Sequence, residues 1–143
     1  MIPIQDIDHV VLRTVDLDAM LHFYGTVLGC PVERRQDDLG LIQLRAGRSL
    51  IDLVPVEGRI GRAGGAAPGA AGAGGRNLDH FCLRVEPFDE AAIRAQLNAA
   101  GITAGALESR NGAQGEGPSI YLNDPDGNTV ELKGPPWEQG KRR

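Results

Sequence analysis

The chain contains the same short block twice, and this repeat limits what it can fold into more than any other feature of the sequence. Residues 7–13 read IDHVVLR, and residues 78–84 read LDHFCLR. The two histidines, His9 and His80, lie 71 residues apart in a chain of 143 residues, which is half its length. Internal self-similarity of this kind predicts that each half of the chain folds as a similar module.

Both blocks alternate between outward and inward positions, as half-buried strands do. A histidine and an arginine therefore share one face of each predicted strand. The residues on this face are His9, Val11 and Arg13 in the first block, and His80, Cys82 and Arg84 in the second.

A helical pattern follows each block. Asp16 can cap the first helix, and Gly29 suits the left-handed position after its end. The second helix ends at Gly101. The expected apolar stripes have spacings of three and four residues. They consist of Leu17, Met20, Leu21, Tyr24 and Leu28 in the first helix, and of Ile93, Leu97 and Ala100 in the second.

Three short strands are expected after each helix. In the second half, the tetrapeptide at 124–127, DPDG, favours a type I turn between the last two strands. Each half therefore reads as a βαβββ module, and the fold class is α+β. Two such modules can pair into a curved eight-stranded sheet with a concave cup for a ligand. The expected strands are 32–36, 41–45 and 49–55 in the first half, and about 103–108, 119–123 and 128–134 in the second.

The halves are joined by a segment that contains only Gly, Ala and Pro at residues 64–75. Such a segment reads as a flexible tether, which lets the modules pair within one chain or across two chains. We expect a single domain over residues 1–143. Its parts are module 1 at about 5–57, a linker at 58–76, module 2 at about 77–134 and a tail at 135–143.

The composition is that of a globular protein, with 41% hydrophobic and 24% charged residues. The net charge of -4 argues against a nucleic-acid partner. The sequence shows no apolar run long enough to span a membrane and no signal-peptide pattern, and its two cysteines make no disulfide framework. A cytoplasmic protein that binds a small molecule is expected. Poorly protected sheet edges favour a homodimer.

Four residues in register with the repeat are candidate metal ligands: His9, Asp52, His80 and Glu131. A lone histidine in a strand is more often a hydrogen-bonded structural residue than a ligand. Two histidines and two carboxylates at matching places favour a divalent ion such as Ni, Co, Zn, Mn or Fe over a cysteine-rich structural zinc. Asp52 has the shorter side chain, so it is the weaker candidate and could bind through water.

Further residues on the same faces are candidates for substrate binding. Arg13 and Arg84 could clamp an anionic substrate or form internal salt bridges. Cys82 could act as a nucleophile beside the metal, or as a small hydrophobe in the cup wall. Tyr121 could face the cup or the helices. His22 lies opposite the apolar stripe of its helix and is expected to be solvated.

Two further segments carry a family resemblance. Residues 124–132, DPDGNTVEL, and residues 23–29, FYGTVLG, resemble the vicinal oxygen chelate superfamily, which includes glyoxalases, bleomycin-resistance proteins and dioxygenases. The resemblance covers about residues 5–134. It implies the paired-module fold, with metal ligands from the first and last strands of each module. These positions correspond to His9, Asp52, His80 and Glu131.

Within the superfamily, the segments HVVLRTVDL and FYGTVLG look like glyoxalase I. That resemblance implies that Arg13 binds a glutathione conjugate and that Glu131 is both a ligand and the catalytic base. The chain departs from glyoxalase I at Asp52, where that enzyme has Glu, and at Val56, where it has Asn. The segment GEGPSIYLNDPDG is similar to fosfomycin-resistance enzymes, but Val11 stands where those carry Thr.

The resemblance implies a metal-dependent lyase or isomerase, similar to lactoylglutathione lyase, that acts on a small substrate with vicinal oxygens. Three alternatives stay open. They are a thiol transferase of the fosfomycin-resistance type, a non-haem iron dioxygenase, and a non-catalytic drug-binding protein of the same fold.

Overall fold

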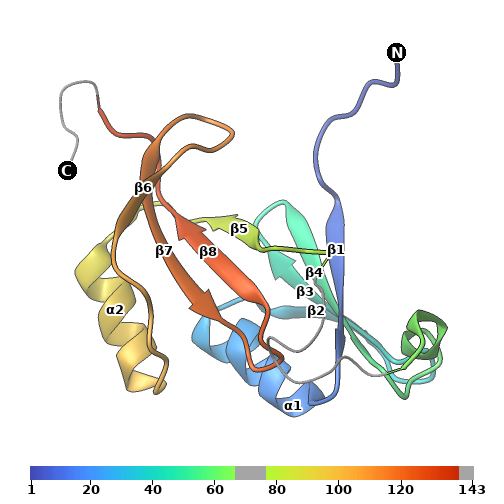
Figure 1. The fold of residues 1–143 in the computed structure, drawn as a ribbon. Coiled ribbons are helices and arrows are strands. Elements are labelled where there is room, and N and C mark those ends of the chain that lie inside the picture. The colour runs from blue at the N-terminus through green and yellow to red at the C-terminus, as the bar shows by residue number, and fades with distance from the viewer. Residues whose placement is uncertain (67–76, 139–143) are drawn as a thin grey trace. The chain divides into compact units, whose positions relative to one another are not determined.

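The computed structural model describes residues 1–66 and 77–138. The chain divides into two compact units, Met1–Ala70 and Ala71–Arg143, and each contains one four-stranded sheet (Figure 1). The α+β class and the two modules predicted from the repeat are confirmed. The pairing of the modules into one eight-stranded sheet stays a prediction. None of the helices in the described ranges is long and apolar enough to cross a membrane.

The first module has a mixed sheet with strand order β1-β4-β3-β2. The first and last strands, β1 and β4, are parallel neighbours, and the other pairs are antiparallel. The elements are β1 (His9–Thr14), α1 (Leu17–Met20), the π-helix η1 (Leu21–Val27), β2 (Val32–Gln36), β3 (Leu41–Ala46), β4 (Ser49–Pro55) and the 3₁₀ turn η2 (Gly61–Gly64).

The second module repeats this topology with strand order β5-β8-β7-β6. Here β5 and β8 are the parallel pair, and the turn at 124–127 forms as predicted, with Gly127 N donating to Asp124 O at 2.9 Å. The elements are β5 (Phe81–Arg84), α2 (Glu90–Ala99), β6 (Glu108–Arg110), β7 (Gly117–Asn123) and β8 (Thr129–Lys133).

The two parallel pairs have the same register. Val11 of β1 lies opposite Asp52 of β4, and Cys82 of β5 lies opposite Glu131 of β8. In both modules the carboxylate is therefore opposite the residue two positions after the repeated histidine. Neighbouring residues in a ladder point to the same face of the sheet, so this register places each carboxylate on the face of its histidine.

The first helix differs from the expected regular α-helix. It is α-helical for only four residues and continues as a π-helix, in which Leu28 N donates to Phe23 O at 2.9 Å. The buried stripe lies to one side of the predicted one, which is therefore only partly right. Met20 and Tyr24 are buried as predicted, whereas Leu17, Leu21 and Leu28 are only half-buried. Phe23 and Val27 are buried in addition.

The helix ends follow the sequence closely. Asp16 caps α1 by accepting a hydrogen bond from Ala19 N at 3.1 Å, and Gly29 and Gly101 have positive φ angles of 80° and 73°. In α2, Leu97 is buried and Ile93 half-buried as expected, but Ala100 lies exposed beyond the last turn.

The strand expected at about 103–108 is largely wrong. Pairing begins only at Glu108 and ends at Arg110, and one isolated bond, Gly105 N to Tyr121 O at 2.9 Å, precedes it. The glycine and alanines of this stretch offer little side chain to pack on a sheet.

The first part of the predicted linker at 58–76 has secondary structure. Residues 58–66 form a turn and η2, whereas residues 67–76, most of the Gly/Ala/Pro stretch, lie outside the described residues. The same holds for residues 139–143 of the predicted tail.

Candidate metal centre

The second module brings a histidine and a carboxylate together. His80 precedes β5 and Glu131 lies in β8, and His80 Nε2 is 3.2 Å from Glu131 Oε2. The other ring nitrogen, Nδ1, donates to Asp79 Oδ2 at 2.7 Å. The Asp79 carboxylate therefore orients the ring and directs Nε2 toward Glu131.

Glu131 is itself held from β7. Ser119 is fully buried, and its Oγ donates to Glu131 Oε1 at 2.6 Å. Glu131 is 4% exposed, so this hydrogen bond is shielded from water. One carboxylate oxygen is thus fixed by the serine, and the other one faces His80.

The first module repeats the arrangement with longer distances. His9 Nδ1 donates to Asp8 Oδ1 at 2.6 Å, and His9 Nε2 is 4.0 Å from Asp52 Oδ2. Asp52 is buried, and the Gln43 amide donates to its two oxygens at 3.2 Å and 3.3 Å. The shorter aspartate is therefore drawn toward Gln43 and does not reach the histidine as closely as Glu131 does.

The carboxylates raise the pKa of both histidines. For His9 the hydrogen bond to Asp8 is the main cause, followed by the charge of Asp52. For His80 the hydrogen bond to Asp79 is the main cause and the charge of Glu131 adds to it, while burial acts in the opposite direction. Each imidazole thus lies between two acidic groups, an environment that favours a positive charge at the position of Nε2.

These donor sets fit a divalent ion. Neutral imidazole and carboxylate are ligands for the borderline divalent metals, and a metal-bound histidine commonly donates its other N–H to a carboxylate. Two donors about 2.1 Å from one ion lie roughly 3.0–3.5 Å apart. The His80–Glu131 separation of 3.2 Å falls in this range, and the His9–Asp52 separation of 4.0 Å exceeds it.

Within each module, as far as it is described, no three His, Cys, Asp or Glu side chains gather as a metal-binding group. Each module contributes one histidine and one carboxylate. That all four predicted ligands bind the same ion stays a prediction.

Arg13 is engaged with the main chain. Its guanidinium donates to the carbonyls of Gly61 at 3.0 Å, Gly64 at 3.0 Å and Gly65 at 2.6 Å, with a longer bond of 3.4 Å to Ala66. A Cβ on Gly64 would lie 2.4 Å from Arg13 Nε, so a larger residue there would require the guanidinium to shift. Arg13 therefore holds residues 61–66 against β1, and no acid of the described residues forms an ion pair with it. Its predicted role in substrate binding stays a prediction.

Three predicted residues of the second module lie near Glu131. Tyr121 faces His80, with ring centroids 5.6 Å apart, which settles its orientation toward the site. Partial burial, then the charge of Glu131, raises the pKa of Tyr121. The same two causes raise the pKa of Cys82 to about 11, which argues against a thiolate nucleophile at neutral pH. Arg84 is exposed, and its side chain makes no hydrogen bond or ion pair among the described residues.

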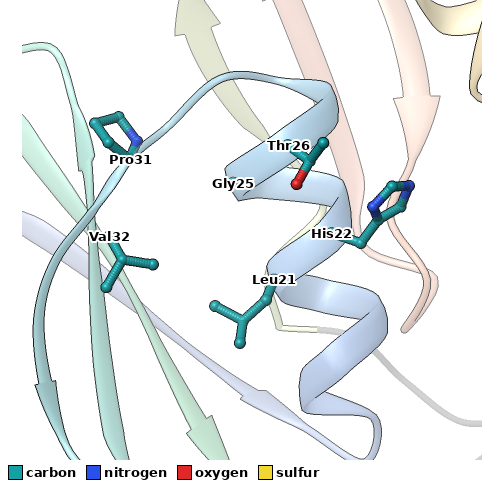
Figure 2. Close-up of a pocket in the computed structure, with 6 residues that line it drawn as sticks. All are labelled: Leu21, His22, Gly25, Thr26, Pro31 and Val32. Carbon is teal, nitrogen blue, oxygen red and sulfur yellow. The ribbon is translucent and has the colours of Figure 1, made fainter.

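The first module has a surface hollow along η1. His22 is exposed as predicted, and in Figure 2 it projects away from Leu21 and Val32. With a single titratable side chain, the hollow offers little chemistry. It is lined by Leu21, His22, Gly25, Thr26, Pro31 and Val32.

Four residues that hold the candidate ligands were not predicted. Asp8 and Asp79 stand directly before the repeated histidines, so the repeated Asp-His pair was a signal that could have found them. Gln43 and Ser119 had no such signal, because they occupy different ladder positions in the two modules. Gln43 is directly opposite Asp52, whereas Ser119 is two residues from Tyr121, the residue opposite Glu131.

These features define a class of protein: two βαβββ modules, each presenting a histidine and a buried carboxylate from neighbouring parallel strands. The chain belongs to the Glyoxalase/Bleomycin resistance protein/Dioxygenase superfamily, which residues 6–132 match. The resemblance seen in the sequence is therefore confirmed at the level of the superfamily.

Two of the similar proteins are identical to this chain at more than a quarter of the aligned residues. The chain is 33% identical over 131 residues to virulence protein STM3117 of Salmonella typhimurium, covering 90% of this chain and 83% of that protein. The crystal structure of STM3117 aligns with a TM-score of 0.72 over 92% of this chain and 98% of that one, at 28% identity. An integron cassette protein of V. cholerae aligns with a TM-score of 0.71 at 26% identity, over 94% and 98% of the two chains.

A third structure shares the fold. Lactoylglutathione lyase from Agrobacterium tumefaciens aligns with a TM-score of 0.64 at 24% identity, over 92% of this chain and 95% of that one.

Proposed function

We propose that the chain is a metal-dependent enzyme, a lyase or isomerase that acts on a small substrate with vicinal oxygens. The observation that supports this most is the repeated triad in which an aspartate bonds to histidine Nδ1 while Nε2 faces a buried carboxylate. The ligands in this proposal are His9, His80 and Glu131, with Asp52 as a weaker fourth. Membership of the superfamily and the likeness to a lactoylglutathione lyase fold are consistent with it.

When bound, a divalent ion of the Ni, Co, Zn, Mn or Fe type would supply Lewis acidity toward two neighbouring substrate oxygens. Side chains of the protein position that ion and move the proton. In the neutral form of each ring, the hydrogen bond to Asp8 or Asp79 holds the proton on Nδ1, which leaves the lone pair of Nε2 for an ion.

Glu131 is the proposed general base. Ser119 fixes Oε1, so Oε2 would have both roles: it faces His80 as the ligand atom, and when released from the ion it could take a proton from a carbon next to a carbonyl. Returning that proton to the adjacent carbon completes an isomerisation without an oxidant or a reductant. Positioned general bases typically contribute about 10² to 10⁴ in rate.

One observation favours a second candidate function, a non-haem iron dioxygenase. Asp52 lies 4.0 Å from His9 Nε2 and is bound by Gln43, so it is the carboxylate less suited to a shared ion. Without Asp52, the proposed ligands are two histidines and one carboxylate, the set used by non-haem iron oxygenases. Metal identity helps to separate the two functions, because the iron dioxygenase needs iron, whereas the lyase could use any ion of this group, so Ni, Co, Zn or Mn would favour the lyase.

The proposed function is tested by metal analysis of the purified protein, followed by activity screening against 2-oxoaldehyde–thiol adducts, epoxides and catechols. Epoxides with a thiol test the transferase alternative. Glu131→Gln should lower turnover at least about 10²-fold. Bound metal is measured in the same samples. A variant that keeps both its metal and near-full turnover would show that Glu131 is not the base. A protein that binds no divalent ion, yet binds a substrate from the panel, would instead be a non-catalytic binder.

We also propose that the chain forms a homodimer. Within the described residues, β1 and β5 each end a sheet with one edge unpaired, and exposed edges are commonly covered by association. Light scattering at micromolar concentration should give twice the mass of the chain across salt conditions. A monomer mass throughout would contradict this.

A further inference from the structure

The two buried candidate carboxylates, Asp52 and Glu131, are held by their sheets in different ways. The Ser119 hydroxyl donates to Glu131 Oε1 at 2.6 Å, so it holds one oxygen and leaves Oε2 at 3.2 Å from His80 Nε2. The Gln43 amide nitrogen lies 3.2 Å from Asp52 Oδ1 and 3.3 Å from Oδ2, so it donates to both oxygens. One carboxylate therefore keeps an oxygen directed at its histidine, whereas the other is centred on an amide.

The strand register explains why Gln43 reaches both oxygens. Gln43 of β3 is the direct ladder partner of Asp52 of β4, and side chains directly opposite each other in antiparallel strands have Cβ atoms about 4.5–5.5 Å apart on one face. Ser119 of β7 lies two residues from the ladder partner of Glu131, so it approaches that carboxylate from one side. The opposite amide thus meets both oxygens of Asp52, and the diagonal hydroxyl meets only one oxygen of Glu131.

Gln43 also supplies the only hydrogen bonds that the Asp52 carboxylate accepts within the described part of the chain. Asp52 is 4% exposed, so solvent has little access to replace the amide. A buried carboxylate that loses its donor needs another partner, because an unsatisfied buried charge is costly. His9 Nε2 is the other polar group beside it, at 4.0 Å. Without the amide, Asp52 should therefore move toward His9 and toward any ion that His9 binds.

A hydrogen bond to a carboxylate can also support metal binding, since ligating carboxylates are commonly hydrogen-bonded themselves. Ser119 has the geometry for this role, because it leaves the oxygen that faces His80 unoccupied. Gln43 does not, because its amide is shared between the two oxygens of Asp52. The two interpretations of Gln43 predict opposite effects of removing its amide: a supporting donor would lower metal affinity when lost, and a competing donor would raise it.

We infer that Gln43 is a positioning residue that keeps Asp52 away from the ion, so that the protein ligands are His9, His80 and Glu131 alone. The inference rests on the proposed function, because it concerns the same metal centre. Three protein ligands leave one more coordination position open to substrate oxygens than four ligands would. Gln43 thus determines how much of the ion is open to the substrate.

The experiment compares Co²⁺ binding by the wild-type chain and by Gln43→Met, using calorimetry and visible absorption. Methionine is close to glutamine in length and volume but donates no hydrogen bond. We expect Gln43→Met to bind Co²⁺ at least about tenfold more tightly, the lower end of the effects of groups that act on a ligand. The absorption band of bound Co²⁺ should also shift, because a carboxylate oxygen joins its ligands. Gln36→Met, which removes a half-buried glutamine of β2, is the matched control and should change neither readout.

A double-mutant cycle assigns the gain to Asp52. Asp52→Ala should change the affinity of the wild type by less than about twofold, but it should remove the whole gain in the Gln43→Met chain. Gln43→Thr is the second variant, since threonine suits a strand and its short hydroxyl cannot span both oxygens. It should give the same gain, and metal-free urea unfolding shows that each variant is folded.

Three results would overturn the inference. A lower Co²⁺ affinity of both Gln43 variants would make the amide a support for Asp52 as a ligand. An unchanged affinity would show that the amide does not hold Asp52 back. A gain that survives Asp52→Ala would show that the effect has another origin.

The same titrations separate this inference from the proposed function. If the wild type binds Co²⁺ and any of those three results appears, the metal centre stands and the role of Gln43 fails. If the wild type binds no Co²⁺ but Gln43→Met binds it through Asp52, the role of Gln43 stands and the metal-dependent function of the native chain fails. No binding by either chain would contradict both.

Discussion

The Ser119–Glu131 hydrogen bond should be one of the more valuable polar contacts of the second module, and its removal gives a quantitative test. Ser119→Ala deletes a hydroxyl that donates to a carboxylate at 2.6 Å, with both residues buried. A hydrogen bond to a charged group contributes about 1.5–3 kcal/mol, and burial of both partners favours about 2–3 kcal/mol. For a chain of this size, that loss lowers the unfolding midpoint by about 5–10 °C.

The assay is urea and thermal unfolding of the metal-free protein at pH 7. The matched control is Ser49→Ala, which removes an exposed hydroxyl that donates to the Ile7 carbonyl at 2.8 Å. The control should change the free energy of unfolding by less than about 0.5 kcal/mol. A Ser119→Ala variant as stable as the control would refute the view that the serine holds Glu131 in place.

Three further predictions concern the histidines and Arg13. Asp79→Asn should weaken metal binding about tenfold, the lower end of the range for such supporting groups, because the Asp79 side chain is 96% exposed. The raised pKa values of His9 and His80 mean that the folded chain binds their protons more tightly. Their contribution to the stability of the metal-free protein is therefore full below about pH 6.5 and lost as the pH rises through the folded-state values. Arg13→Met should speed tryptic cleavage within residues 61–66 about tenfold, since even about 1.4 kcal/mol of lost hydrogen bonding gives that factor.

Each of these three predictions is tested by a separate measurement. Metal affinity of Asp79→Asn is compared by calorimetry with Asp37→Asn, an exposed acid elsewhere, and equal affinities would count against the supporting role of Asp79. The unfolding free energies of the wild type and of the doubly substituted His9→Gln, His80→Gln chain are compared at pH 5.5 and 8.5, and a difference that does not change with pH is the contrary result. Arg48→Met, at an exposed ion pair, is the proteolysis control.

The repeat made most of the fold predictable. The Asp-His and Leu-Arg pairs recur after 71 residues, which predicts two copies of one topology. The structure has this repeat, with β1 parallel to β4 and β5 parallel to β8. The π-helix was not predictable from apolar spacing. The buried residues Met20, Phe23, Tyr24 and Val27 themselves have spacings of three and four, so the sequence offered two overlapping apolar stripes and the spacing alone did not decide between them.

The repeat made the four candidate ligands predictable, whereas contacts that depend on a single side chain were not. His9, His80, Asp52 and Glu131 lie at repeated ladder positions, and the structure brings them together in pairs. The engagement of Arg13 with backbone carbonyls could not be foreseen, because main-chain acceptors of an irregular segment leave no trace in residue identity.

The most direct test of the proposed metal centre is a Co²⁺ titration of the metal-free chain, followed by calorimetry and visible absorption. The wild type should bind about one ion per chain. His9→Ala and His80→Ala should each lower the affinity at least about tenfold, while His22→Ala, on the exposed face of η1, should not change it. Wild-type affinity in both the His9 and His80 variants, or no saturable Co²⁺ binding by the wild type, would contradict the assignment.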